Sequence, residues 1–163
     1  MKILFNKLTL VIACVLLLIN LSCQKDGIDL NGETDYIIFG SSYGFCVGEC
    51  ATTYLLKSDG LYKSTTYLKT GELNSFTEKL SVEKFSQVKG LEQKVPKEFL
   101  NENSEEKTFG CPDCADQGAL FLEVARRGHQ NKRFTIDTRT DGLPDYVKSV
   151  AIHIKAGIEI ARN

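Results

Sequence analysis

Apolar and polar residues recur with two different periods along the chain, and the change of period separates strands from helices. Residues 36–40, 52–57 and 61–69 are rich in β-branched and aromatic side chains, which indicates three strands. Asp59-Gly60 lies between the second and third runs and predicts a tight hairpin, because glycine adopts the positive φ of such a turn without strain. We expect the second and third strands to pair antiparallel.

The pattern becomes helical after Gly71. Ser81 is a good N-cap, apolar residues follow at positions 82, 85 and 88, and Gly90 marks an end. Pro96 favours the first turn of a second helical piece, which contains two apolar residues at positions 99 and 100. Residues 101–106 are then expected to form a solvated acidic loop.

The last third of the chain predicts two more strands and a long helix. Apolar residues at 120, 122 and 124 alternate with Phe121 and Glu123, and residues 134 and 136 repeat the alternation. The basic stretch 126–133 between them reads as a solvated hairpin tip, with binding of phosphate or an acidic glycan as the alternative. Gly142 and Pro144 precede a helix whose apolar positions mark a core face: Leu143, Val147, Val150, Ile154, Ile158 and Ala161.

The order of these elements is β-β-β-α-α-β-β-α, which predicts the α+β class. The simplest arrangement is an antiparallel sheet of about five strands with helices packed on one face. We expect this single domain to span residues 36–163.

The first 22 residues have a different character from the rest. Lys2 and Lys7 precede an apolar run at 8–19, and about 12 residues are too few to cross a bilayer, which takes roughly 20. The segment therefore reads as a signal peptide. Ser22-Cys23 at its end resembles the lipobox of bacterial lipoproteins, although Asn20 stands where that motif usually has an aliphatic residue. The alternatives are an ordinary secretory signal and a retained membrane helix.

The lipobox resemblance implies that Cys23 becomes the first residue and carries fatty acyl chains such as palmitate, which would anchor the protein in the membrane. Residues 23–35 contain two glycines, several charges and no periodicity, and we expect a flexible tether. Removal of 22 residues from 163 leaves 141, enough for one domain with a real core. The expected location is the bacterial cell envelope, with the outer membrane favoured over other sites.

Charge excludes one class of partner. The removed segment carries two lysines and no acidic residue, so the remaining chain has 18 basic and 21 acidic residues and a formal charge of −3. This balance does not favour a nucleic-acid binder. Two histidines, His129 and His153, lack any motif around them, and Asp137, Asp141 and Asp145 match no calcium loop. We expect no catalytic residue, metal or cofactor and lean against an enzyme.

Four of the six cysteines lie in two short motifs: Cys46-Val-Gly-Glu-Cys50 and Cys111-Pro-Asp-Cys114. In an exported protein an even set of cysteines favours disulfides. A four-thiolate zinc site is one alternative. A redox centre is another, because Cys-Pro-x-Cys resembles the active-site motif of thioredoxin-like enzymes, but that motif should open a long helix and here precedes a strand.

The Cys46-x-Gly48-x-Cys50 motif at a strand start, the following Tyr54, the Asp-Gly hairpin and the final Pro144-led helix resemble a family of small bacterial domains found on Bacteroidetes lipoproteins. The chain departs from that family at Ala51, where proline is usual. No activity has been assigned to the family, so the resemblance implies a fold and a location in the cell envelope but no function.

Chain entropy favours disulfides that cross between the motifs, because these close the larger loop. The resembling family carries the first pair without the second, and this favours local pairs, Cys46 with Cys50 and Cys111 with Cys114. We expect a non-enzymatic, membrane-anchored domain that binds an unidentified protein or ligand. The alternative function is a thiol-disulfide redox protein using Cys111 and Cys114.

Overall fold

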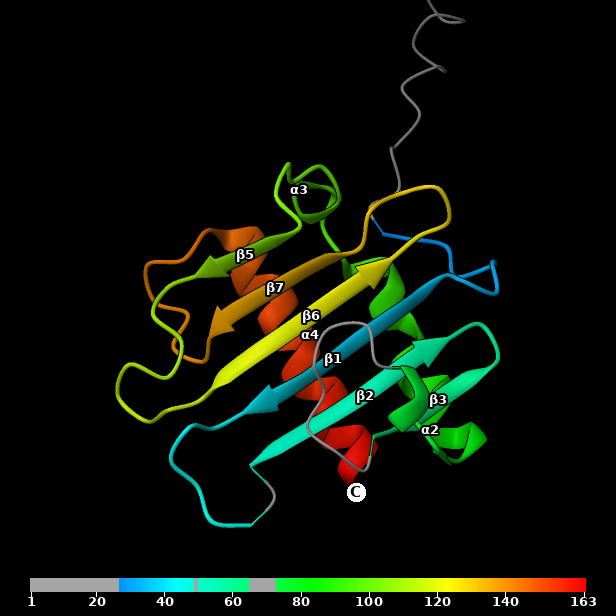
Figure 1. Cartoon of the computed structure of the whole chain (residues 1–163), viewed down its shortest axis with the longest axis horizontal. Coiled ribbons are helices and arrows are strands. Elements are labelled where there is room, and N and C mark those ends of the chain that lie inside the picture. Colours follow the sequence, from blue (N-terminus) through cyan, green and yellow to red (C-terminus); the bar gives the residue numbers. More distant parts are fainter. Residues whose placement is uncertain (1–26, 49, 65–72) are drawn as a thin grey trace, which may run out of the picture.

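Seven strands form one mixed sheet in the computed structural model, which describes residues 27–48, 50–64 and 73–163. Their order across the sheet is β4-β3-β2-β1-β6-β7-β5 (Figure 1). All neighbours are antiparallel except β5 and β7, which are parallel. The strands are β1 (Tyr36–Ser42), β2 (Ala51–Lys57), β3 (Gly60–Lys63), β4 (Glu78–Lys79), β5 (Glu106–Phe109), β6 (Ala119–Ala125) and β7 (Lys132–Asp137).

The α+β class is confirmed, but the expected antiparallel sheet of about five strands is wrong in two respects. The sheet gains β4 and β5 at its edges, and β5 makes it mixed. In β5 only Phe109 is buried, and the strand begins at the last residue of the expected acidic loop. An edge strand needs main-chain partners rather than an apolar alternation, so its side chains carried no signal.

The predicted hairpin between β2 and β3 is present, but its turn is displaced by one residue. Lys57 pairs with Gly60, so Ser58 and Asp59 form the turn. Neither Asp59 nor Gly60 has a positive φ. An added Cβ at position 60 would lie 2.7 Å from Cε of Lys79 on β4, but this flexible side chain can move aside, so neither φ nor space requires glycine there. The third strand was expected to reach position 69 and ends at Lys63, while residues 65–72 lie outside the described part.

Helices cover one face of the sheet, as expected (Figure 1). They are α2 (Val82–Val88), α3 (Lys97–Leu100) and α4 (Asp145–Arg162). The 3-10 turn η2 (Lys89–Lys94) joins α2 to α3, whereas η1 (Leu73–Ser75) precedes β4. Ser81 caps α2 as predicted, with its hydroxyl accepting from the Lys84 N–H at 3.3 Å. Gly90 does not end the helical path, because η2 continues through it, and Pro96 is the N-cap of α3 rather than a first-turn residue.

The long helix α4 lies behind β1 and β6 and supplies much of the core (Figure 1). Gly157 lets it approach the sheet closely, since a Cβ there would lie 3.1 Å from the Phe39 ring. Leu143, expected on the core face, precedes the helix and is only partly buried. The other predicted core positions are confirmed: Val147, Val150, Ile154, Ile158 and Ala161 are buried.

The packed domain begins earlier than the expected boundary at Tyr36. Ile28 and Leu30 are buried in the main core, and the Ile28 N–H donates to the Glu92 carbonyl at 2.8 Å. The part of the expected tether that the structure describes is therefore docked, because two apolar side chains outweigh the polar composition around them. The signal peptide, Cys23 and residues 24–26 lie outside the described part. No helix within residues 27–48, 50–64 and 73–163 is long and apolar enough to span a bilayer.

Candidate functional site

The two cysteine loops leave the same end of the sheet. Ser42, the last residue of β1, pairs with both Ala51 at the start of β2 and Ala119 at the start of β6. The loops before these two strands, residues 43–50 and 110–118, are therefore neighbours (Figure 1). A hydrogen bond joins them, from the Gly44 N–H to Asp113 Oδ2 at 2.8 Å.

Each disulfide closes its own loop. Cys46 bonds with Cys50 and Cys111 with Cys114, and the Cα atoms of each pair are 5.5 Å apart. This is the local pairing that the resemblance favoured. The zinc alternative would need the four sulfurs to converge, and the described residues contain no such group of three or more potential metal ligands.

The first loop presents apolar side chains to solvent. Phe45 is 86 % exposed, Val47 is 104 % exposed and Tyr43 is 43 % exposed. The Tyr43 N–H donates to the Cys50 carbonyl at 2.8 Å and closes the base of the loop. Apolar side chains grouped on one exposed loop are typical of a contact surface, whereas single ones, such as the 80 % exposed Val82, are common.

The second loop is instead held by a network of hydrogen bonds around two carboxylates. Asp113 Oδ1 accepts from the Gly118 N–H at 3.0 Å, while its Oδ2 binds Gly44 of the other loop. Asp137, at the end of β7, accepts from the Cys111 N–H at 3.0 Å and from Gln117 Nε2 at 3.2 Å. The second loop is thereby fixed both to the sheet and to the first loop.

Asp137 is ionised over most of the pH range. Burial acts to raise the pKa of its carboxyl, but the donors from Arg139, Cys111 and Gln117 outweigh this effect and hold the pKa below its ordinary value of 3.8. The Arg139 N–H, at 2.8 Å from Oδ1, is the closest of these donors. A charge placed here strengthens each bond it accepts.

The surroundings of Cys111 and Cys114 differ from those of a catalytic dithiol. Both cysteines are exposed, but the loop passes through positive φ at Asp113 and Asp116 and enters β6 rather than a helix. Catalytic thiolates are usually stabilised by a helix N-terminus or a cation. Here Asp113 lies between the two cysteines in the chain and Asp137 accepts from the Cys111 N–H, and carboxylates near a thiol disfavour its thiolate.

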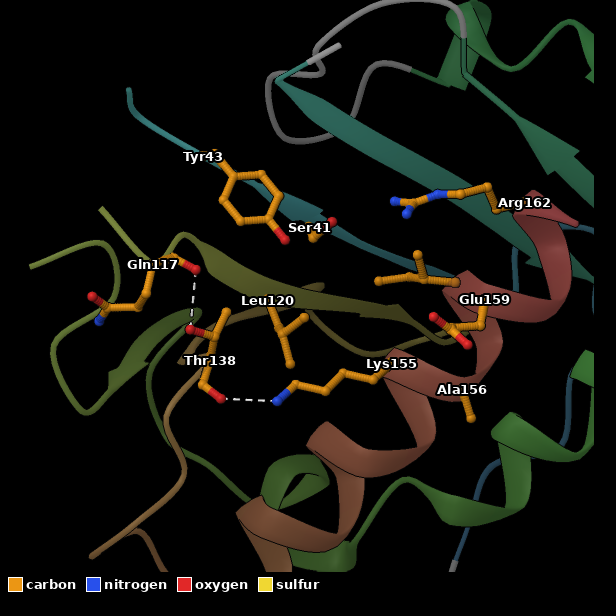
Figure 2. Close-up of a pocket in the computed structure, with 10 residues that line it drawn as sticks. Ser41, Tyr43, Gln117, Leu120, Thr138, Lys155, Ala156, Glu159 and Arg162 are labelled. Atoms are coloured by element: carbon orange, nitrogen blue, oxygen red, sulfur yellow. Dashed lines mark hydrogen bonds between the residues drawn. The ribbon is translucent and has the colours of Figure 1, made fainter. Parts of the chain in front are cut away.

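A groove of about 460 Å³ opens beside the first loop, between α4 on one side and the end of β1 and the start of β6 on the other (Figure 2). Its floor is formed by the buried Leu120 and Ile158. Figure 2 shows the Tyr43 ring on one side and the Arg162 and Glu159 side chains reaching in from α4. Its remaining lining residues are Ser41, Gln117, Thr138, Lys155 and Ala156.

A second polar group lies on the sheet face away from the helices. Glu123 is 1 % exposed, accepts from the Tyr36 hydroxyl at 3.2 Å and lies 3.5 Å from Nη1 of Arg133. Burial raises the pKa of Glu123 above its ordinary value of 4.5, and that of Tyr36 to about 12. Apolar residues surround the pair, namely Ile38, Leu55, Phe76, Phe121 and Ala125. The group therefore belongs to a small second core.

The remaining candidates are dispersed. His129 is exposed at the β6–β7 tip, and His153 lies on α4, where burial and the charge of Lys94 lower its pKa below 6.5. Asp141 and Asp145 are exposed, and they do not join Asp137 in a ligand cluster within the described residues.

Sequence reasoning missed the groove. The period that places core residues on one side of α4 also places Lys155, Glu159 and Arg162 together on another, and this charged stripe was the available signal. The sequence did not indicate that this stripe faces Tyr43 of a distant loop.

Comparisons of the chain with protein-family models, with curated proteins and with solved structures found no match.

Proposed function

We propose that the protein is a lipid-anchored lipoprotein of the bacterial envelope, at the outer membrane, and that its domain is a non-enzymatic binding module. The binding surface is the exposed first loop, with Phe45 and Val47 as its contact residues. Aromatic and aliphatic anchors of this kind carry most of the energy of protein interfaces. The resemblance to domains of Bacteroidetes lipoproteins supports the address and leaves the partner open.

One observation carries the proposal: Phe45 and Val47 stand 86 % and 104 % exposed on a loop that a disulfide closes. Closing a loop before binding reduces the entropy lost when the partner arrives. An apolar pair with no such role would expose hydrophobic surface without benefit and promote aggregation.

The position of this loop suits an anchored receptor. The described chain starts near the β6–β7 tip, and the first cysteine loop lies at the opposite end of the molecule (Figure 1). Ile28 is docked in the core, so a lipid on Cys23 would be separated from it by four residues, a reach of roughly 17 Å at most. Such a short connection would favour an orientation in which the apolar loop points away from the lipid surface.

The anchor is tested by substitution of Cys23. Cys23→Ala should move the protein from the membrane to the soluble fraction, and mass spectrometry of the wild type should find acyl chains on Cys23. Cys14→Ala is the matched control, because it removes a cysteine from the segment expected to be cleaved. Membrane retention of Cys23→Ala would contradict the lipoprotein assignment.

The binding surface is tested by site-specific photo-cross-linking in intact cells. A photoreactive residue at Phe45 should give a discrete higher-mass adduct that disappears when Val47→Ser is added. Ile152 on α4, which is 63 % exposed, is the matched control for an apolar side chain outside the loop. Equal adducts at both positions, adducts to lipid alone, or none at Phe45 would contradict the proposal.

A thiol-disulfide role for Cys111 and Cys114 is the alternative, and the exposure of both residues favours it. The carboxylates of Asp113 and Asp137 beside the loop oppose it. We expect the purified protein to reduce insulin no faster than a Cys111→Ser/Cys114→Ser control. Turnover that vanishes in that control would make the redox function the better assignment.

A further inference from the structure

The groove beside the first loop has a charge arrangement that selects its ligand. Within the described residues, the guanidinium of Arg162 and the carboxylate of Glu159 make no ion pair or side-chain hydrogen bond, although both are exposed on successive turns of α4. Both point into the groove (Figure 2). Their hydrogen-bonding capacity is therefore available to a ligand.

Positive charge predominates in the groove. Lys155 lies two turns before Arg162 on the same helix, and its ammonium donates to the Thr138 carbonyl at 2.8 Å, which fixes the charge at the groove wall. Arg162 and Lys155 together outweigh Glu159 by one charge. A free guanidinium presents two parallel donors, the geometry that matches a carboxylate.

The rest of the lining is apolar or carries hydroxyl groups. Leu120 and Ile158 are 3 % and 6 % exposed and form an aliphatic floor. The hydroxyls of Tyr43 and Ser41 lie across from Arg162 (Figure 2). A volume of about 460 Å³ is in the range of small-ligand sites and too small for a folded domain.

We propose that this groove binds the C-terminal end of a peptide chain that finishes in an aliphatic residue. The terminal carboxylate is held by Arg162, the last side chain lies over Leu120 and Ile158, and a peptide N–H donates to Glu159. A free carboxylate next to an aliphatic group is the combination that these three features fit. The inference rests on the proposed role as a binding domain and names a ligand for a site next to the first loop.

The test is titration calorimetry of the purified full chain with acetyl-Ala-Leu as free acid and as C-terminal amide. The free acid should bind and the amide should bind at least about tenfold more weakly, since it lacks the charge that Arg162 recognises. Arg162→Gln should weaken binding of the free acid by about the same factor. Arg162→Lys should weaken it by less, because lysine keeps the positive charge and loses only the two parallel donors of the guanidinium. Arg127→Gln, at the opposite end of the sheet, is the matched control.

Glu159→Gln separates this ligand from a cationic one. It weakens the acceptor of the peptide N–H equally for acid and amide, and it removes a negative charge that opposes only the carboxylate of the acid. The preference for the free acid over the amide should therefore rise roughly twofold or more. No binding of the free acid, equal binding of acid and amide, or a smaller preference for the acid in Glu159→Gln than in the wild type would overturn the proposal. If the peptide does not bind but Phe45 cross-links to a partner, the proposed function stands and the groove assignment fails. If the peptide binds but Phe45 does not cross-link, the groove assignment stands and the binding role of the first loop fails.

Discussion

The two cysteine loops are closed by the same kind of short disulfide and differ in what holds the rest of each loop. The first loop has a main-chain bond at its base and one bond to its neighbour, and its tip carries the exposed Phe45 and Val47. The second loop carries no large apolar side chain and is fixed through Asp113 and Asp137. The first loop is thus built to present side chains and the second to support it.

The largest effect should follow removal of the carboxylate that fixes the second loop to the sheet. Asp137→Ala leaves the donors of Cys111, Arg139 and Gln117 without their acceptor, and we expect a loss of about 3 kcal/mol in the free energy of unfolding. Asp141→Ala, an exposed acidic residue nearby, should change it by less than about 0.5 kcal/mol. Urea denaturation measures both, and equal losses would mean that the network does not support the loop.

The same residue predicts a dependence on pH. The folded-state pKa of Asp137 lies below its ordinary value of 3.8, so its contribution is present above that pH and is lost as the pH falls through the folded-state pKa. The difference in unfolding free energy between wild type and Asp137→Ala should therefore shrink on acidification. A difference that stays constant down to about pH 3 would show that the ionised form is not what stabilises the loop.

The disulfide of the second loop should contribute the next largest amount. Cys111→Ser/Cys114→Ser raises the conformational entropy of the unfolded chain, while the hydrogen bonds keep the folded loop ordered. The free energy of unfolding should therefore fall by about 2 kcal/mol. The crystal or solution structure of this variant should retain the bond between Gly44 and Asp113. Disorder of residues 110–118 would show that the disulfide, and not the network, orders the loop.

The bond between the loops should matter less. Asp113→Asn tolerates the positive φ of 59° at this position and keeps only one carbonyl acceptor for two donors, so we expect a loss of about 1 kcal/mol. Hydrogen exchange should accelerate at the Gly44 amide and stay unchanged at Tyr43. Unchanged exchange at Gly44 would mean that the second loop does not support the first.

The smallest effect on stability should come from the disulfide of the first loop. Cys46→Ser/Cys50→Ser removes the disulfide and frees the loop in the folded as well as in the unfolded state. The gains in chain entropy of the two states largely cancel, so the loss in the free energy of unfolding should stay below about 1 kcal/mol. Cross-linking at Phe45 should nevertheless fall sharply, because the tip is no longer held for its partner. A stability loss equal to that of the second pair would remove the distinction between the loops.

Residues with a strong local period were predictable from the sequence. The alternation at Leu120 and Leu122 and the helical spacing from Val147 to Ala161 place their elements correctly, because each signal depends on one face packing against one core. The docking of Ile28 and the pairing of β5 depend instead on surfaces built by distant parts of the chain. Local composition around them is polar and gave no indication of either.

The candidate site was predictable only in part. Cysteine spacing pointed to both loops, since chemistry and sequence coincide there. Tyr43 and Arg162 are 119 positions apart and line the same groove only because α4 crosses behind β1. Such a meeting follows from the angle at which a helix packs on a sheet, which no single stretch of sequence encodes.

The place of β7 in the sheet also dictates an order of assembly. It lies between β5 and β6 although it follows both in the chain, so β5 has no partner in this sheet until the β6–β7 hairpin has formed and docked. We expect the β6–β7 hairpin to form before β5 pairs with it, because local pairings form faster than non-local ones. The second cysteine loop joins β5 to β6, so it is completed only when β5 has paired. Until then the edge of β7 is open to pairing with other chains, which is a route to misassembly.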